Sequence, residues 1–159
     1  MDNLNTNDKI LDLGCGPSHF DHMLSDNGFK EYVGIDFSSV AIKMSKEKTS
    51  FTYIESNLNY IDYIKYNDYV IVSTETFEHI EDDISLIKKL PKNRILFSVP
   101  NFMSENHYRT YDSEEQIIDY YKNIIDIDNI KEFKVSKKED LLYLLQLVKL
   151  FKLLVGIGI

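Results

Sequence analysis

The sequence predicts an α/β fold, a doubly wound and mainly parallel sheet. Short apolar runs of strand length alternate along the chain with segments of helical period. The first run ends in a glycine turn, Asp12-Leu13-Gly14-Cys15-Gly16. Residues 1–159 contain no internal repeat and no Gly/Ser/Pro-rich linker, which favours a single domain. Because strands that alternate with helices imply right-handed crossovers, most neighbouring strands are expected to be parallel.

The first half of the chain has the pattern of three strands and two helices. Strands are expected at residues 10–13, 32–36 and 51–55. The first helix is expected at residues 18–27, where apolar side chains recur at helical spacing before Gly28. Ser38 or Ser39 has the side chain of a helix N-cap, and it predicts a second helix that ends near Lys46.

The second half continues the alternation. Residues 69–73 form a continuous β-branched run, which suits a strand that is buried on both faces of a parallel sheet. A helix is expected at residues 82–90, followed by a strand at 94–99. The segment Ser113-Glu114-Glu115-Gln116 has capping-box spacing and predicts another helix. A sixth strand is expected at residues 130–135.

The segment 141–159 allows two interpretations. A strand at 141–148 would lie antiparallel to the preceding strand, because the link 136–140 is too short for a parallel crossover. Its Leu-rich composition favours a helix with a narrow polar stripe of Gln146, Lys149 and Lys152. We expect the helix. Because so wide an apolar band needs a second surface, the helix predicts a homo-oligomer through 141–159.

The net charge and the cysteine content restrict the partners and the compartment. A net charge of −8 argues against nucleic acid and against anionic membranes, both of which attract clustered Lys and Arg. A small-molecule substrate is therefore expected, with no stable membrane insertion. Cys15 is the single cysteine, so no internal disulfide is possible. Residues 1–8 lack the apolar core of a signal peptide, which predicts a cytoplasmic protein.

The glycine turn and Asp36 together predict a nucleoside site. Gly14 and Gly16 allow a sharp turn in which a ligand lies against the main chain. Asp36 follows Gly16 by 20 residues, the spacing at which a carboxylate accepts hydrogen bonds from ribose hydroxyls. His19 stands where a dinucleotide fingerprint requires glycine, which argues against NAD. The cationic S-adenosylmethionine suits a site rimmed by Asp12 and the acidic segment 75–78.

Three segments resemble sequence motifs of a known family, and they occur along the chain in the same order as in that family. Ile10-Leu11-Asp12-Leu13-Gly14-Cys15-Gly16-Pro17 resembles motif I of class I S-adenosylmethionine-dependent methyltransferases. Gly34-Ile35-Asp36-Phe37-Ser38 is similar to their second motif. Glu75-Thr76-Phe77-Glu78-His79-Ile80 resembles the segment after the fourth strand in the small-molecule branch, which includes ubiquinone-biosynthesis-type O-methyltransferases. The resemblance covers roughly residues 9–135.

The resemblance implies a Rossmann-like methyltransferase fold, the cofactor S-adenosyl-L-methionine and a set of cofactor-binding residues. In this family Gly14 and Gly16 would approach the methionine part, and Asp36 would hold the ribose. The main chain near Thr74 and Glu75 would receive the amino group, while His107 and Arg109 would lie towards the acceptor. The complete expected set is Asp12, Gly14, Cys15, Gly16, Asp36, Phe37, Asn57, Leu58, Thr74 and Glu75.

Methyl transfer to a hydroxyl needs at most one base, and His79 or His107 is the candidate. No metal is expected in the site. An equally good interpretation has Glu78 and His79 merely stabilising the entrance of the next helix. Two other function classes remain open: a noncatalytic nucleoside-binding or scaffolding domain with the same fold, and an NAD-dependent oxidoreductase.

Overall fold

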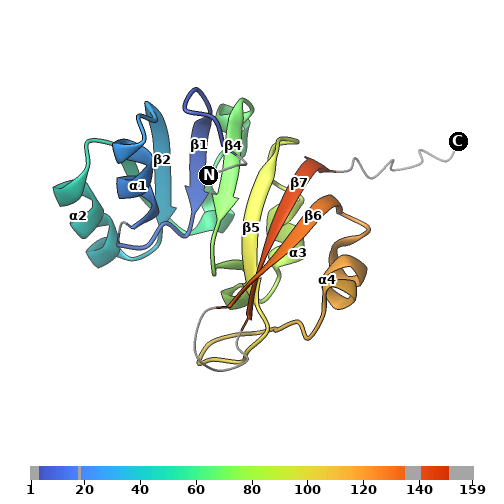
Figure 1. The fold of residues 1–159 in the computed structure, drawn as a ribbon. Helices are drawn as coiled ribbons and strands as arrows, with labels where there is room; N and C mark the ends of the chain where they lie inside the picture. Colours follow the sequence, from blue (N-terminus) through green and yellow to red (C-terminus); the bar gives the residue numbers. More distant parts are fainter. Residues whose placement is uncertain (1–3, 18, 135–140, 151–159) are drawn as a thin grey trace, which may run out of the picture.

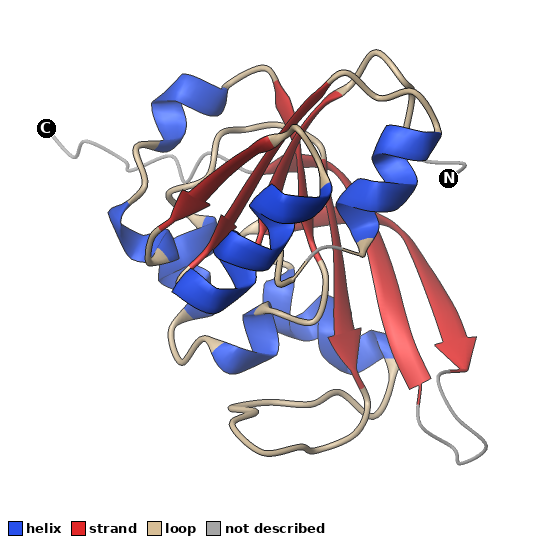
Figure 2. Ribbon diagram, turned by 90° about the vertical axis from the view of Figure 1, so that its left-hand side faces the viewer, coloured by secondary structure: helices blue, strands red, loops and turns tan. Residues whose placement is uncertain are grey.

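The computed structural model describes residues 4–17, 19–134 and 141–150, which contain one seven-stranded sheet. Helices cover both faces of this sheet (Figures 1 and 2). The strand order is β3-β2-β1-β4-β5-β7-β6. The strands from β3 to β5 in this order pair in parallel, whereas β7 is antiparallel to both of its neighbours. The predicted doubly wound, mainly parallel α/β sheet is therefore confirmed.

The first half of the chain supplies three neighbouring strands and the two helices on one face. The strands are β1 (Lys9–Leu13), β2 (Glu31–Asp36) and β3 (Thr52–Glu55). The helices are α1 (Phe20–Asp26) and α2 (Ser39–Lys48). As predicted, Ser38 caps α2, and its hydroxyl accepts a hydrogen bond of 3.2 Å from the Ala41 N–H. The short 3₁₀ helices η1 (Leu58–Tyr60) and η2 (Tyr63–Tyr66) lead to β4 (Tyr69–Ser73).

The second half completes the sheet and covers its other face. After β4 come η3 (Phe77–His79), α3 (Asp83–Ile87) and β5 (Ile95–Pro100). The chain then forms α4 (Glu114–Tyr121), β6 (Ile125–Lys134) and β7 (Leu141–Leu150). The long loop 101–113 between β5 and α4 extends beyond the end of β5, at the bottom of Figure 1.

The prediction of a helix at the start of segment 141–159 is wrong. Residues 141–150 form β7, whose register pairs Ile95 with Leu147 on one side and Lys134 with Leu141 on the other. Backbone pairing with two strands outweighs the helical preference of a Leu-rich segment. The antiparallel direction agrees with the short link 136–140. Residues 151–159 lie outside the described residues, and self-association, which was argued from a helical band, stays a prediction.

Two other boundaries differ from the expected ones. Helix α3 ends at Ile87 rather than at residue 90, because the N–H groups of Lys89 and Leu90 donate to carbonyls three residues back. This tightening of the chain precedes Pro91, which disfavours helix in the residue before it. Strand β6 begins at Ile125 instead of residue 130, and two irregularities in its register with β7 accommodate the added residues.

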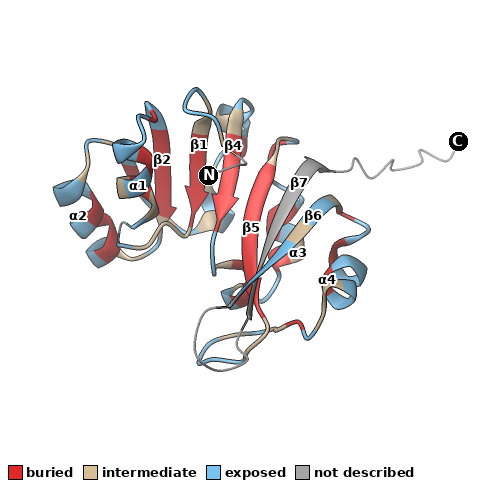
Figure 3. Cartoon of the chain, in the orientation of Figure 1, coloured by how far each residue is buried: buried red, intermediate tan, exposed pale blue. Residues whose placement is uncertain are grey.

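Two apolar cores hold the central strands rigidly between the helical layers. Side chains of α1 and α2 pack on one face of the sheet, together with Ile10 of β1. Side chains of α3 and α4 pack on the other face, together with Leu11 and Leu13. Strands β1, β4 and β5 are accordingly buried along most of their length (Figure 3). The loops that follow these strands therefore begin at well-packed strand ends.

In the described part of the chain, no helix has the length and apolar character needed to cross a lipid bilayer.

Candidate active site

A cavity of about 840 Å³ lies at the carboxyl ends of the parallel strands. In open α/β sheets ligands bind at this edge, where the order of the strands reverses. The reversal lies between β1 and β4, and segments that follow each of the strands β1 to β5 contribute to the wall. The lining residues are Gly14, Asp36, Phe37, Ser56, Asn57, Leu58, Asn59, Glu75, Thr76, His79, Ile80, Glu81, Asn106 and Tyr108.

The turn after β1 requires its glycines. Gly14 and Gly16 have φ angles of 76° and 57°, in the left-handed region that favours glycine. A Cβ atom on Gly14 would lie 2.3 Å from the Thr76 hydroxyl oxygen, so the backbone at Gly14 directly contacts the segment after β4. The Gly14 N–H donates to the Ile35 carbonyl at 2.8 Å. The turn therefore exposes main chain, rather than a side chain, to the cavity.

Asp36 links the glycine turn to the end of β2. One carboxylate oxygen accepts a hydrogen bond of 3.0 Å from the Gly16 N–H, and the other accepts one of 2.8 Å from the Ser38 N–H. The 20-residue spacing in the sequence thus corresponds to a direct contact. Each carboxylate oxygen retains a further lone pair, and Asp36 lines the cavity. These are the requirements for accepting hydrogen bonds from the hydroxyls of a ribose.

Residues on the β3 side form an apolar and amide wall. Phe37 lines the cavity with 81% of its surface exposed, and Leu58 lies in the same wall. The Asn57 side chain caps η1 by accepting a hydrogen bond of 2.9 Å from the Asn59 N–H. These three predicted residues are brought together, and a planar base fits between such apolar surfaces.

Asp12 does not lie on the rim of the cavity, contrary to the expectation from the sequence. Its side chain is 2% exposed and accepts a hydrogen bond of 2.7 Å from the Tyr32 hydroxyl on the α1/α2 side of the sheet. Burial raises the pKa of Asp12 to about 7, although the hydrogen bond from Tyr32 opposes this shift. Alternation along β1 explains the position, because Leu11 and Leu13 face the other side.

Cys15, Gly16 and Thr74 also do not line the cavity. The Cys15 sulfur packs so closely on β2 that a Cβ atom added to Gly34 would lie 2.8 Å from it. Burial raises the pKa of the Cys15 thiol, as expected for a packing residue that is not a nucleophile. The Thr74 carbonyl accepts a hydrogen bond of 3.1 Å from the Thr76 hydroxyl.

Two residues of the cavity wall that are not glycine have left-handed backbone. Glu75 has φ of 50° and Asn106 has φ of 67°. Such conformations are uncommon for residues with a Cβ and concentrate at functional sites. The Glu75 N–H donates to the buried Ser98 hydroxyl at 2.9 Å, which fixes the turn after β4 on β5.

The two candidate catalytic histidines lie side by side. The rings of His79 and His107 have centroids 4.6 Å apart and an interplanar angle of 79°. His79 lines the cavity, whereas His107 lies behind it in the loop 101–113. The Tyr108 N–H donates to the Glu78 carbonyl at 2.7 Å and so attaches this loop to η3. The Glu78 side chain is buried, and burial raises its pKa to about 7.

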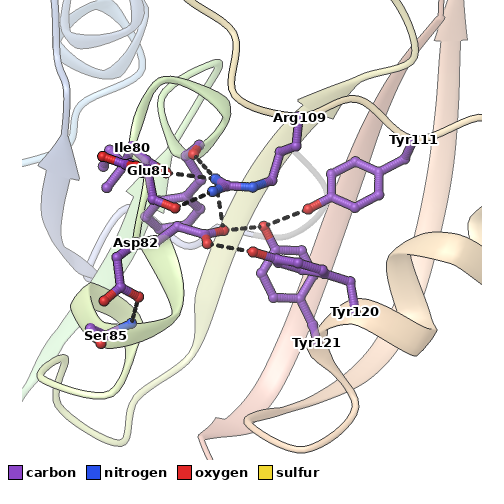
Figure 4. A network of polar contacts seen from close by, with 10 residues as sticks. Ile80, Glu81, Asp82, Ser85, Arg109, Tyr111, Tyr120 and Tyr121 are labelled. Atoms are coloured by element: carbon purple, nitrogen blue, oxygen red, sulfur yellow. Dashed lines mark hydrogen bonds and ion pairs between the residues drawn. The ribbon is translucent and has the colours of Figure 1, made fainter.

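Arg109 holds the main chain around η3 and does not line the cavity, although the resemblance implied a position towards the acceptor. One guanidinium nitrogen donates to the carbonyls of Phe77 and Ile80 at 2.6 and 2.7 Å, and the other donates to Glu81 at 2.6 Å (Figure 4). The first also pairs with the fully buried Asp83 carboxylate at 3.3 Å.

Two tyrosines of α4 complete this polar network on the Asp83 carboxylate. The hydroxyls of Tyr120 and Tyr121 donate to it at 2.9 and 2.8 Å (Figure 4). The Tyr111 hydroxyl donates to that of Tyr121 at 3.2 Å. The network therefore connects the segment 77–81, α3 and α4. Its arginine, aspartate and tyrosine side chains hold the segment that carries His79 and do not themselves line the cavity.

Comparison with known proteins decides the family. Residues 4–146 match the family model described as "Methyltransferase domain". The chain belongs to the S-adenosylmethionine-dependent class I methyltransferases. As a methyltransferase domain it uses S-adenosylmethionine as its cofactor. The resemblance found in motif I is therefore confirmed at the level of this family.

Solved structures share the fold of this methyltransferase domain. A protein from Listeria monocytogenes assigned to the S-adenosylmethionine dependent methyltransferases has a TM-score of 0.71 at 19% identity, over 93% of this chain and 94% of that chain. Magnesium protoporphyrin IX methyltransferase from Synechocystis PCC 6803, with bound SAH, has a TM-score of 0.70 at 15% identity, over 91% of this chain and 75% of that chain. Such low identities indicate a shared fold alone.

A curated relative of the domain is a mouse protein, the eEF1A lysine and N-terminal methyltransferase. It is 25% identical over 97 residues, which are 58% of this chain. The chain spans about 14% of the length of that relative.

The cavity of the methyltransferase domain collects most but not all of the predicted cofactor residues. Six of the ten line it, namely Gly14, Asp36, Phe37, Asn57, Leu58 and Glu75. Sequence reasoning missed Ser56, Asn59, Thr76, Ile80, Glu81, Asn106 and Tyr108. Asn106 and Tyr108 carry no local signal, because they lie in a loop whose path depends on contacts with η3. Thr76 could have been predicted, because it lies within the acidic segment 75–78 that was expected to rim the site.

Proposed function

We propose that this methyltransferase domain transfers the methyl group of S-adenosylmethionine to a hydroxyl of a small molecule. The observation that carries the proposal is the placement of the lining residues on the two sides of the strand-order reversal. Gly14, Asp36 and Asn57 lie at the ends of β1, β2 and β3 and form one end of the cavity, which suits a nucleoside. His79 and Tyr108 follow β4 and β5 and form the other end, where we place the acceptor. A volume of about 840 Å³ lies in the usual range for small-molecule sites.

The reaction in this proposal is an in-line displacement at the methyl carbon. The acceptor hydroxyl loses its proton beside His79 and His107, to an imidazole or to water, and its oxygen forms a bond to the methyl carbon. The carbon–sulfur bond breaks, and its electron pair moves to sulfur to give S-adenosylhomocysteine. Positioning supplies much of the acceleration in such a reaction, so one activating group for the hydroxyl is sufficient.

The charge of the domain supports a small acceptor. Glu75 and Glu81 line the cavity, and the net charge of the chain is −8. A polyanion such as duplex nucleic acid would be repelled, because its affinity comes from Lys and Arg at the phosphates. We also propose a cytoplasmic location, which is compatible with a chain that holds a single cysteine.

An amine acceptor on a protein is the second candidate. It is favoured by the name of the mouse relative, a lysine and N-terminal methyltransferase, and by the acidic wall, which would attract a cationic amine. The family match argues against the other two classes considered from the sequence, a noncatalytic nucleoside-binding domain and an NAD-dependent oxidoreductase.

Thermal unfolding and a labelled methyl group test the proposal. S-adenosylmethionine and S-adenosylhomocysteine should raise the melting temperature, whereas NAD and ATP should not, because a ligand of the folded state stabilises it by mass action. A panel of phenols and aliphatic alcohols is then offered with methyl-labelled cofactor, beside lysine peptides. Label on a hydroxyl supports the proposal. Label on peptide amines alone would favour the second candidate instead. A rise in melting temperature with NAD equal to the rise with S-adenosylmethionine would refute both candidates.

A further inference from the structure

The buried carboxylate of Glu78 lacks a partner. Its side chain is 1% exposed, and neither oxygen has a hydrogen-bond partner among the described residues. A buried carboxylate without partners is costly, and native structures normally supply a donor or a cation. The nearby guanidinium of Arg109 is already engaged by three carbonyls and by Asp83. Both oxygens of Glu78 are therefore available to a cation from outside the chain.

Two imidazoles lie next to this carboxylate. Glu78, His79 and His107 each offer a ligand atom, and these atoms all lie within 4.8 Å of one another. The Nδ1 of His79 donates to the Asn106 carbonyl at 3.1 Å, and the Nδ1 of His107 donates to the Phe102 carbonyl at 3.3 Å. Each ring is thereby left with its lone pair on Nε2. Metal-ligating histidines have this arrangement, with the other ring nitrogen bonded to a carbonyl or carboxylate.

We propose that Glu78, His79 and His107 bind a divalent transition-metal cation beside the acceptor end of the cavity. The sequence predicts a site that holds no metal, and this proposal departs from that prediction. Two imidazoles and one carboxylate suit Zn²⁺, Mn²⁺ or Co²⁺ better than Mg²⁺ or Ca²⁺, which prefer oxygen ligands. Three protein ligands leave a position open for substrate, as in catalytic zinc sites.

The three ligand atoms are close enough to share one cation. They all lie within 4.8 Å of one another, and two ligand atoms at roughly 2.0–2.2 Å from a shared cation lie within about 4.4 Å of each other. His79 is exposed and lines the cavity, so its side chain is accessible to the cation. Glu78 and His107 are attached to each other's segments through the hydrogen bond from Tyr108 to the Glu78 carbonyl.

The metal site determines which role His79 and His107 have in methyl transfer, and in that respect it rests on the proposed function. The acceptor oxygen occupies the open position and loses its proton to water, because a bound cation lowers the pKa of a coordinated hydroxyl. The resulting oxyanion forms the bond to the methyl carbon as the carbon–sulfur bond breaks towards sulfur. The imidazoles then serve as ligands and not as bases.

Metal binding is tested first without any turnover. Untagged, chelator-treated full-length protein is titrated calorimetrically with Zn²⁺, Mn²⁺ and Mg²⁺, and Co²⁺ absorption reports nitrogen ligation. We expect one site, tighter for Zn²⁺ and Mn²⁺ than for Mg²⁺. Glu78→Gln and His79→Gln should weaken Zn²⁺ binding by at least ~100-fold. The matched controls Glu47→Gln and His22→Gln, on helices α2 and α1, should change it less than twofold.

The variants are chosen so that misfolding does not imitate the result. Glu78→Gln keeps the shape of the side chain and removes a buried charge, so the melting temperature of the metal-free variant should equal or exceed that of the parent. Unchanged Zn²⁺ affinity in Glu78→Gln and His79→Gln, or no binding by the parent, would overturn the site. Full methyl transfer by the metal-free protein would also overturn it, while leaving the proposed function intact. Tight Zn²⁺ binding without transfer to any hydroxyl would support the site and refute the proposed function.

Discussion

The two ends of the cavity are built in different ways. At the cofactor end, main-chain groups of the glycine turn meet the Asp36 carboxylate, and both directly follow strands of the parallel sheet. At the acceptor end, His79 and His107 come from η3 and from a long loop, and side chains distant in sequence hold them. Arg109 bonds to carbonyls 28 to 32 residues away.

The shared scaffold therefore determines the first end and leaves the second free to vary. A turn between a buried strand and a helix has few conformations, so the cofactor end follows from the sheet itself. The acceptor end depends on one guanidinium and its partner Asp83. Substrate selection in this domain is therefore expected to change through loops such as 101–113 while the cofactor end stays the same.

The Arg109→Ala variant should break the acceptor end alone, and it has the largest expected effect. Removal of the guanidinium leaves Asp83 buried without its cation, which costs roughly 3–5 kcal/mol of unfolding free energy. Chemical denaturation measures the loss. Arg94→Ala, which removes an ion pair with Asp8 that is more exposed, should cost about 1 kcal/mol or less. If the two variants lose equal stability, the network around Asp83 is not the support described.

Replacement of His79 by Ala tests the chemistry of the acceptor end. Turnover should fall by ~10²-fold or more, because the activating group for the acceptor hydroxyl is lost. Cofactor affinity should stay close to that of the parent, since His79 lies at the other end of the cavity. His22→Ala on α1 serves as the control for loss of an imidazole. A small effect of His79→Ala beside a dead His107→Ala would mean that the roles of the pair are reversed.

The Asp36→Ala variant tests the cofactor end. We expect S-adenosylmethionine binding to weaken by roughly 1.5–3 kcal/mol, the scale of charge-assisted hydrogen bonds to a ribose. Calorimetry gives the affinity, and the exposed Asp62→Ala variant, which removes the cap of η2, provides the comparison. An affinity within twofold of the parent would show that Asp36 does not hold the ribose.

A pH-dependent effect is expected at Asp12, beneath the glycine turn. Burial raises its pKa from 3.8 to about 7, so the folded protein retains a proton that the unfolded chain releases. The stability contributed by the neutral carboxyl is complete below pH 4 and is lost as the pH rises to about 7. Asp12→Asn should therefore raise the melting temperature at pH 8 and not at pH 4. The exposed Asp126→Asn should show no such pH dependence, and a parallel response of both variants would refute the argument.

Local signals predicted the sheet, and six of the ten residues expected at the cofactor line one cavity. The glycine turn, Asp36 and the β-branched run of β4 each occupy a few adjacent residues, and their meaning depends on the backbone alone. The same reasoning failed for Asp12, because an acidic residue next to a glycine turn can face either side of its strand. It also failed for β7, where the partner strands and not the Leu-rich composition decide the structure.

Long-range contacts explain what the sequence left open at the acceptor end. An arginine in a loop gives no sign that it will meet Asp83 and three carbonyls. Glu78 was expected at a helix entrance, and its burial without a partner depends on loop 101–113 folding over η3. These contacts depend on the packing of segments that are far apart in the chain, and the periodicity of apolar residues does not predict such packing.

The place of β7 in the sheet has a consequence for how the chain is made. During synthesis the N-terminal strands emerge first. One edge of β5 stays unpaired until β7, the last described strand, has been made. Ile95 of β5 finally pairs with Leu147, a contact between distant parts of the chain that slows folding. Until then β5 is an apolar strand with an open edge, a surface on which nascent chains aggregate. Chaperones that cover such edges would be expected to raise the yield of this protein more than any change at its cavity.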